Sequence, residues 1–226
     1  MRKLLTLISI LTVFLMSISS PIPVYAFQSE PQTAYAREFI QKCDGQNWFI
    51  EEVERMLNVQ EKTLNTIKSR SDFEYITSFG LKESGISGTL PRAFGELYNL
   101  REIFLADNEL TGSIPAEIFT LSKLENLDLS NNKLTGQISP DISKLTSLKT
   151  LLLWRNQFNG LIPTEIGNLV SLVNLDLAEN LLTGQVPDTL GNLRNLKILC
   201  LSANRQGGLI TYEKNHLSNT GNSNSI

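Results

Sequence analysis

The sequence predicts an α/β solenoid, in which similar units stack side by side and share one sheet and one core. Three observations support this prediction. A pattern of 24 residues recurs six times without an insertion. Apolar residues occupy the same positions in each complete unit, and one asparagine and one glycine position recur with them. The six units begin at Ile76, Leu100, Leu124, Leu148, Leu172 and Leu196.

Each unit opens with a short segment that has the periodicity of a strand. In the third unit, Leu127 and Leu129 at positions 4 and 6 alternate with the polar residues Asn126, Asp128 and Ser130. A period of two is typical of a strand that is buried on one face. One such strand cannot bury its apolar face alone, so we expect the units to align their strands in a parallel sheet.

Position 9 comes where the chain turns off the predicted sheet and where backbone groups lack partners in the ladder. A buried side-chain amide at this point can satisfy backbone groups of both neighbouring units. The first unit has Ser84 at this position. The other five units have Asn108, Asn132, Asn156, Asn180 and Asn204.

Glycine at position 13 and proline at position 16 shape the second half of the unit. The glycine permits a backbone conformation that a side chain would resist, and the proline ends a second extended segment. The third unit has Ser139 at position 16 and Pro140 one place late, so we expect a local irregularity there. The glycines are Gly88, Gly112, Gly136, Gly160, Gly184 and Gly208; the prolines are Pro91, Pro115, Pro163 and Pro187.

These positions together resemble the LxxLxLxxNxLTGxIP subtype of the leucine-rich-repeat family. The resemblance covers residues 76 to about 210, with the sixth repeat incomplete. It implies a right-handed horseshoe with a parallel sheet on its concave face. This subtype is best known from plant receptor ectodomains and cell-wall inhibitors, and it also occurs in bacterial surface proteins. The resemblance therefore implies a recognition protein without naming its partner.

The first 26 residues have the pattern of a cleaved signal peptide. Arg2 and Lys3 precede an apolar run, and Val24 and Ala26 place small residues at a cleavage site after position 26. The alternative is an N-terminal membrane anchor, although the run is short for a span. Cleavage would remove two of the 20 basic residues and none of the 23 acidic ones, which gives a net charge of −5. This balance argues against nucleic acid or an anionic membrane as the partner.

The two ends of a solenoid need caps, because the terminal units would otherwise expose the core. Residues 27–75 are predicted to form a helical N-terminal cap, with apolar residues at helical spacing and a second short helix at Leu64 and Ile67. Plant receptor caps use a pair of cysteines, whereas this segment has Cys43 alone. Internalin-type bacterial proteins therefore offer the better comparison for the cap. Residues 211–226 are predicted to be a polar, disordered tail. No C-terminal cap is evident, which leaves three alternatives. The tail folds over the last strand, a partner covers that strand, or the chain is shortened relative to a longer relative. The apolar cap residues are Phe49, Ile50, Val53, Met56 and Leu57.

The two cysteines are expected to be too far apart for a disulfide. Cys43 lies in the predicted cap and Cys200 lies in the sixth strand. Five strand spacings of about 4.8 Å separate the first strand from the sixth, whereas a disulfide needs Cα atoms within about 7 Å. Cys200 is left either as a small apolar residue that the tail covers or as a partner in an intermolecular bond.

A group of side chains on the concave face is the predicted binding site, because packing does not dictate the residues that point away from the core. Exposed aromatic and arginine side chains provide much of the binding energy at interfaces. The alternative is that Phe104 and Trp154 pack against neighbouring side chains along the sheet. Trp154 also suits stacking on a sugar ring. The predicted partner-binding residues are Phe104, Asp128, Leu152, Trp154, Arg155 and Asp176.

The sequence favours an extracellular, non-enzymatic binding module for a protein ligand or a surface glycan, of the kind that acts in adhesion or host interaction. No nucleophile and base occur together, and we expect no catalytic residues, metal site or cofactor. The alternatives are a plant-type receptor-like or inhibitor-like protein and a structural component of a cell envelope. The chain has no N-x-Ser/Thr glycosylation site, and we therefore expect a bacterial exported protein. The sequence does not indicate an oligomeric state.

Overall fold

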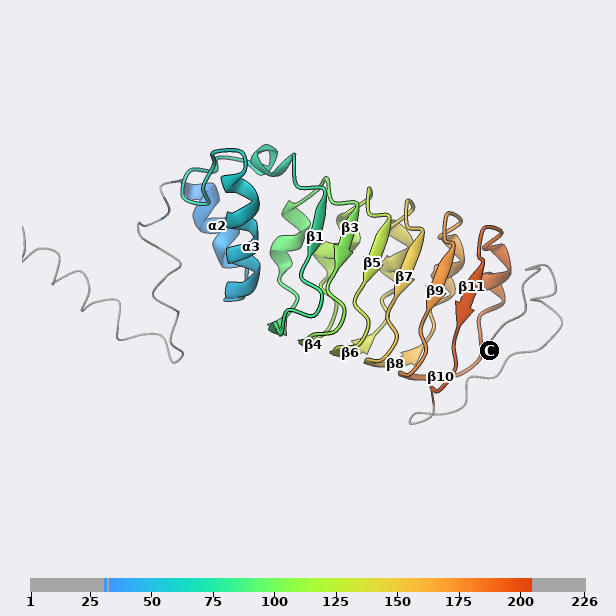
Figure 1. Ribbon diagram of the computed structural model, residues 1–226. Coiled ribbons are helices and arrows are strands. Elements are labelled where there is room, and N and C mark those ends of the chain that lie inside the picture. Colours follow the sequence, from blue (N-terminus) through green and yellow to red (C-terminus); the bar gives the residue numbers. More distant parts are fainter. Residues whose placement is uncertain (1–30, 32, 205–226) are drawn as a thin grey trace, which may run out of the picture. The chain divides into compact units, whose positions relative to one another are not determined.

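The computed structural model describes Pro31 and residues 33–204 of the 226-residue chain. A six-stranded parallel sheet runs through this part, and its strands lie in the order in which they occur in the sequence (Figure 1). Each of the six repeats contributes one strand, as the alternation of apolar residues predicts. The strands are β1 (Ser78–Gly80), β3 (Glu102–Phe104), β5 (Asn126–Asp128), β7 (Thr150–Leu152), β9 (Asn174–Asp176) and β11 (Ile198–Cys200).

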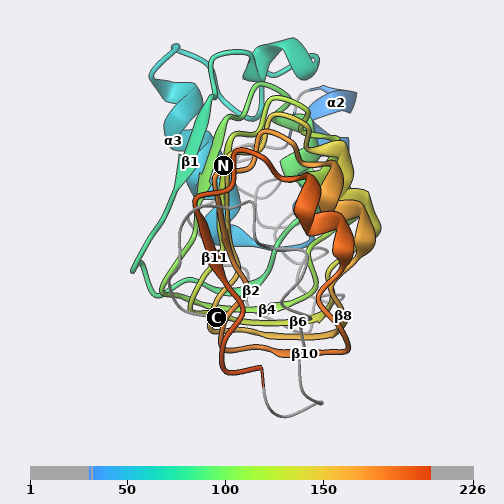
Figure 2. The same cartoon turned by 90° about the vertical axis from the view of Figure 1, so that its right-hand side faces the viewer.

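A second parallel sheet and a column of short helices complete each turn of the solenoid. The end-on view in Figure 2 shows the two sheets and the helices on different sides of one core. The second sheet contains β2 (Ser87–Thr89), β4 (Glu109–Gly112), β6 (Lys133–Gln137), β8 (Gln157–Leu161) and β10 (Leu181–Thr183). The 3₁₀ helices are η3 (Arg92–Glu96), η4 (Ala116–Thr120), η5 (Pro140–Lys144), η6 (Thr164–Asn168) and η7 (Asp188–Asn192). The predicted α/β solenoid is therefore confirmed.

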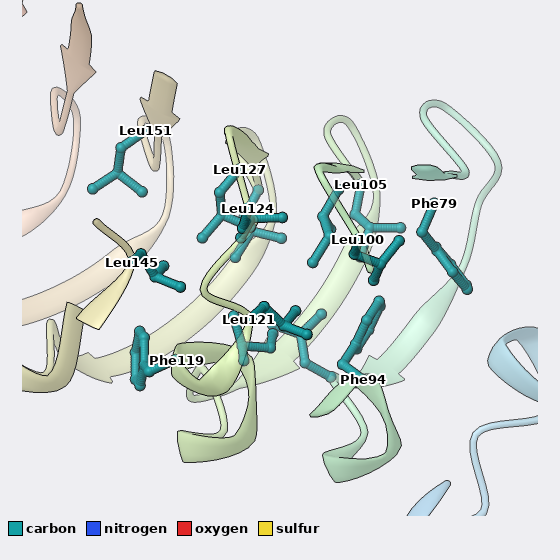
Figure 3. Close-up of a cluster of buried hydrophobic side chains, with 14 of the residues drawn as sticks. Phe79, Phe94, Leu100, Leu105, Phe119, Leu121, Leu124, Leu127, Leu145 and Leu151 are labelled. Carbon is teal, nitrogen blue, oxygen red and sulfur yellow. The ribbon is translucent and has the colours of Figure 1, made fainter. Parts of the chain in front are cut away.

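The core is a stack of leucine-type side chains from successive repeats (Figure 3). Ile103, Leu127 and Leu151 at position 4 are all completely buried, and each lies opposite the next in the sheet register. Burying one such side chain contributes about 1.5–3 kcal/mol. The recurrence of these positions every 24 residues is thus the main source of the fold.

The position-9 asparagines bind backbone groups along the inside of the stack. The side-chain oxygen of Asn132 accepts a hydrogen bond from the Leu110 amide at 3.0 Å, and its nitrogen donates to the Leu105 and Leu129 carbonyls at 2.9 and 3.1 Å. Both Leu110 and Leu105 belong to the preceding repeat, and Leu129 belongs to the same one. The amide therefore joins its own repeat to the preceding repeat, and the expected contact to the following one was wrong.

The turns after the strands explain two further fixed positions. The five position-13 glycines in the described residues all have positive φ, between 75° and 97°, as predicted. Position 8 also lies in the left-handed region, although its residues have side chains; Arg155 has φ of 56°. The third repeat is not irregular, because the Ser139 hydroxyl accepts a bond from Asp141 N at 3.2 Å and Pro140 begins a 3₁₀ helix as long as its neighbours.

The N-terminal cap contains two α-helices, α2 (Ala34–Lys42) and α3 (Asn47–Asn58). Phe49, Val53 and Leu57 of α3 are buried at helical spacing, as predicted. Leu64 and Ile67 are buried too, but their segment forms turns rather than the predicted second helix. A 3₁₀ helix, η2 (Arg70–Phe73), lies further along the chain. Burial alone was therefore a poor indicator of helix in this stretch.

Aromatic rings join the cap to the first repeat. The ring of Phe49 from α3 lies 5.2 Å from that of Phe79 in β1 and 4.7 Å from that of Phe94 in η3, measured between centroids. The Gln46 side chain accepts a hydrogen bond from Thr89 N of β2 at 3.1 Å. The cap thereby covers the apolar end of the stack that the first repeat would otherwise expose.

The signal peptide and the polar tail predicted from the sequence lie outside the described residues. Cys43 in the cap is buried, and its thiol donates a hydrogen bond to the Phe39 carbonyl, with 3.3 Å between sulfur and oxygen. Burial raises the pKa of this thiol. Cys200 lies at the other end of the stack, in β11. None of the helices in the described part of the chain is both long and apolar enough to span a membrane.

Candidate functional site

The middle row of the six-stranded sheet brings four of the six predicted site residues together. The sheet register pairs Phe104 with Asp128, Asp128 with Leu152, and Leu152 with Asp176. Adjacent strands are about 4.8 Å apart, so these side chains are direct neighbours on the face opposite the core. All four are half-buried. Gly80 precedes Phe104 in the same row and leaves one flank of that ring without a neighbouring side chain.

Trp154 and Arg155 lie just beyond the end of β7, next to this row. The Arg155 guanidinium lies 5.4 Å from the centre of the Trp154 ring, within the range of a cation–π contact. Its Nε also donates to Glu179 at 2.9 Å. The backbone of Arg155 has φ of 56°, in the left-handed region. We call Phe104, Asp128, Leu152, Trp154, Arg155 and Asp176 the sheet-face patch.

The two carboxylates of the sheet-face patch accept hydrogen bonds from neutral donors. Asp128 accepts from the Ser130 amide at 3.1 Å and from its hydroxyl at 2.6 Å. Asp176 accepts from the Ala178 amide at 3.0 Å. Burial raises the pKa of Asp176; the Ala178 and Cys200 hydrogen bonds act against this, and repulsion by Glu179 and Asp128 adds to it. The patch therefore places two carboxylates with neutral hydrogen-bond donors beside its apolar side chains.

Acidic residues on either side of the middle row have cationic partners instead. At position 2, Glu125 binds Arg101 at 2.7 Å and Lys149 at 2.6 Å. At position 8, Asp107 lies 3.4 Å from Lys82 and Glu179 lies 2.9 Å from Arg155. Sequence reasoning missed the position-2 pairs, although the alternation of basic and acidic residues at one repeat position would have indicated them.

The two aromatic rings of the patch do not belong to the aromatic cluster that stabilises the cap. That cluster includes Phe49, Phe79 and Phe94. Trp154 instead lies between Ser130 and Ala178, the small residues at the same repeat position on the adjacent strands. Ser130 is only 2% exposed, so neighbouring side chains cover this small residue.

Catalysis is a poor explanation for the carboxylates of the patch. Asp128 and Asp176 are separated by one strand, a distance of about 10 Å between backbones, which is wider than the usual pair of glycosidase carboxylates. Within residues 33–204, no group of three His, Cys, Asp or Glu side chains is arranged to hold a metal ion. The arrangement suits contact with a partner.

A second surface feature, a pocket of about 240 Å³, lies between the end of α3 and the start of β1. Met56, Val59 and Tyr75 form part of its wall, and Val59 and Tyr75 are both strongly exposed. Its carboxylate, Asp72, is bound by Lys62 at 2.9 Å. None of the sheet-face patch residues lines this pocket, so the two features are independent.

Stacked 24-residue repeats with an asparagine ladder define the class of leucine-rich-repeat solenoids. The family model for the leucine-rich repeat region matches residues 54–219, which is more than half of the chain. The chain belongs to this family. The comparison with curated proteins finds no match.

Solved structures with the same fold include plant receptor ectodomains. The ectodomain of the receptor kinase SOBIR1 from Arabidopsis thaliana is 33% identical, with a TM-score of 0.54 over 56% of this chain and 68% of that one. The plant peptide hormone receptor RGFR1, solved in complex with RGF2, is 40% identical, with a TM-score of 0.50 over 51% of this chain. This chain spans only 18% of the length of RGFR1.

A plant protein with a different printed role has the same fold. A plant ice-binding protein is 33% identical, with a TM-score of 0.54 over 62% of this chain and 44% of that one. A receptor and an ice-binding protein thus share the solenoid, and the function of this chain has to be argued from its own surface.

Proposed function

We propose that this protein is an exported, non-enzymatic binding module that recognises a protein partner through the sheet-face patch. The observation that carries the proposal is that Phe104 and Leu152 lie in the middle row of the sheet, with Trp154 two residues after Leu152. Aromatic side chains on a rigid sheet lose little conformational freedom on binding and often dominate interfaces. The repeat stack holds them at fixed spacing. The complex of RGFR1 with RGF2 shows that a related solenoid can bind a peptide.

The test is a pull-down with the tagged chain, in which Phe104→Ala/Trp154→Ala is compared with wild type. If both residues are hot spots, the double variant should lose at least about 4 kcal/mol of binding free energy. The matched control is Leu161→Ala/Val170→Ala, which truncates two side chains that are 64% and 57% exposed and lie off the patch. A partner captured by wild type and the control but lost by Phe104→Ala/Trp154→Ala supports the proposal. Equal capture by all three proteins contradicts the proposed site.

A surface glycan is a second candidate, and the observation that favours it is the half-buried indole of Trp154 with small residues on both sides. One face of such a ring can stack on a sugar. A glycan array that gives a single ligand, with binding lost in Trp154→Ala and retained in Phe104→Ala, would favour this candidate over a protein partner. Loss in both variants would favour the protein, whose larger footprint covers both rings.

Ice binding does not fit the other sheet well. An ice surface is a periodic, uncharged lattice, and a matching face needs a regular array of uncharged groups. In the second sheet, Thr89 lies opposite Thr111, but Thr111 lies opposite Lys133, which forms an ion pair with Glu109. Charges therefore interrupt the hydroxyl groups of this sheet.

A further inference from the structure

The charges of the sheet face identify the chemistry of the partner more closely. Glu102, at position 3 of the second repeat, accepts a hydrogen bond from the Asn126 side-chain amide at 3.5 Å and forms no ion pair within residues 33–204. Of the acidic groups at positions 2 and 8, Glu125 is neutralised by two cations and Asp107 and Glu179 by one each. Asp128 and Asp176 differ from them. Their hydrogen-bond donors are backbone amides, a hydroxyl and a thiol, and neither forms an ion pair with a lysine or arginine of residues 33–204.

The two carboxylates flank an apolar ridge. Leu152 lies between Asp128 and Asp176 in the row, and Trp154 follows two residues later, just beyond the end of β7. A lysine or arginine has an apolar stem and a charged head. Its stem can lie along such a ridge while its head reaches a carboxylate on either side. An acidic or purely apolar segment would leave both carboxylates without a counter-charge when water is excluded.

We propose that the occupant of the sheet-face patch is a cationic peptide segment whose lysine or arginine side chains bind Asp128 and Asp176, with their stems and adjacent apolar residues on Leu152, Trp154 and Phe104. This inference rests on the proposed function, because it names the partner chemistry of the same site. It goes further in that it excludes neutral and acidic ligands. Charge complementarity of this kind sets specificity and association rate at interfaces.

The test uses three sets of synthetic decapeptides that share leucine and phenylalanine at alternate positions. The intervening residues are arginine or lysine in the first set, glutamine in the second and glutamate in the third. Binding is measured by biolayer interferometry on the immobilised chain at low and high salt. We expect the cationic set to bind, with weaker binding at high salt because surface charges are screened, and the glutamate set not to bind.

The variants separate this proposal from general attraction to an acidic protein. Asp128→Asn and Asp176→Asn should each weaken binding of the cationic set by about tenfold or more, as expected for loss of a charged hydrogen bond. The control is Glu125→Gln, which removes one negative charge from the same face at a carboxylate that already has two partners. Glu125→Gln should change binding of the cationic set by less than about twofold, because the Glu125 carboxylate lies at the rim and is already neutralised by Arg101 and Lys149.

Each outcome decides the question. If the glutamine and glutamate sets bind as well as the cationic set, and Phe104→Ala/Trp154→Ala abolishes binding of all three, the sheet-face patch is a binding site but the cationic partner is wrong. Equal effects of Asp128→Asn and Glu125→Gln would reduce the attraction to net charge and overturn the proposal. If wild type binds no peptide set and captures no protein, the proposed function fails as well.

Discussion

Removal of one asparagine of the ladder tests how the repeats are held together. Asn156 is 7% exposed and lies between the third and fourth repeats. Its oxygen accepts from Leu134 N at 3.0 Å, and its nitrogen donates to the carbonyls of Leu129, Leu153 and Trp154 at 2.9, 3.2 and 3.4 Å. Replacement by alanine removes all four contacts and adds no steric conflict.

The four backbone groups that bind Asn156 differ in the hydrogen bonds that they keep after the substitution. The Leu129 carbonyl keeps a bond from Asn132, the Leu153 carbonyl keeps one from Asn180, and the Trp154 carbonyl keeps one from the Asn131 amide. The buried Leu134 amide is the group that the substitution leaves without its acceptor. An orphaned buried amide costs about 1–3 kcal/mol and the lost bonds to shared carbonyls add about 1 kcal/mol. We therefore expect Asn156→Ala to lower the free energy of unfolding by about 2–4 kcal/mol.

Urea denaturation followed by circular dichroism measures this loss. The slope has to be compared as well as the midpoint, because repeat proteins can unfold in parts. Asn159→Ala is the control, since Asn159 is an exposed asparagine of β8 in the same repeat. It should stay within about 0.5 kcal/mol of wild type. If Asn156→Ala is no more destabilised than Asn159→Ala, the ladder does not contribute in the way that its geometry implies.

Two further predictions concern the junction of the cap with the first repeat. Gly88→Ala should lower the free energy of unfolding by about 2–4 kcal/mol, because φ is +97° and a Cβ would meet the Gln46 side chain. Gly85→Ala is the control: φ is +66°, the space around it is open, and the loss should be about 1 kcal/mol. Equal melting temperatures for the two variants would contradict this prediction. Burial by itself would raise the pKa of Glu96, but hydrogen bonds from Lys42 and Tyr35 hold this pKa below the ordinary 4.5. The free energy of unfolding should therefore fall as the pH drops from about 4.5 through the lower pKa of the folded state. Glu96→Gln should make this fall smaller in thermal melts recorded at different pH values.

The repeat portion of the fold could be predicted from the sequence because each of its features recurs. Six copies of the same apolar spacing average out local ambiguity, and position-13 glycines in every unit leave little choice for the turn. The direction of the asparagine contacts could not be predicted in the same way. The periodic sequence predicts that the Asn132 side chain binds a neighbouring repeat. Whether that repeat is the preceding or the following one depends on the handedness of the turn.

The cap was predicted less well because its sequence has no internal repeat. Phe49, Val53 and Leu57 have clear helical spacing, and α3 was found. Leu64 and Ile67 have a spacing that fits one helical turn as well as two separate turns, and the structure has turns there. The helix α2 was missed because only Ala36 and Phe39 are buried in it, and two residues do not establish a period.

The sequence predicted which residues of the candidate site share a row of the sheet, but it did not predict the contacts that their side chains make. Register alone placed Phe104, Asp128, Leu152 and Asp176 in one row. The contact of Arg155 with Trp154 was not predicted, and neither was the left-handed backbone of position 8, which an arginine rarely adopts. The burial of Ser130 at position 7 was also unexpected, since that position points away from the core.

The charge pairs are distributed unevenly over the six-stranded sheet. At the edge where the strands begin, Glu125 is held between Arg101 and Lys149, and at the edge where they end, Arg155 holds Glu179. Interfaces in general have an apolar centre with a polar rim. Here Glu125 and Glu179 are paired on the sheet itself, whereas Asp128 and Asp176 beside the apolar side chains, like Glu102 in β3, form no ion pair with a lysine or arginine of residues 33–204. A surface that only had to be soluble would gain nothing from leaving these charges beside aromatic rings. The arrangement is explained if the missing counter-charge comes from the partner.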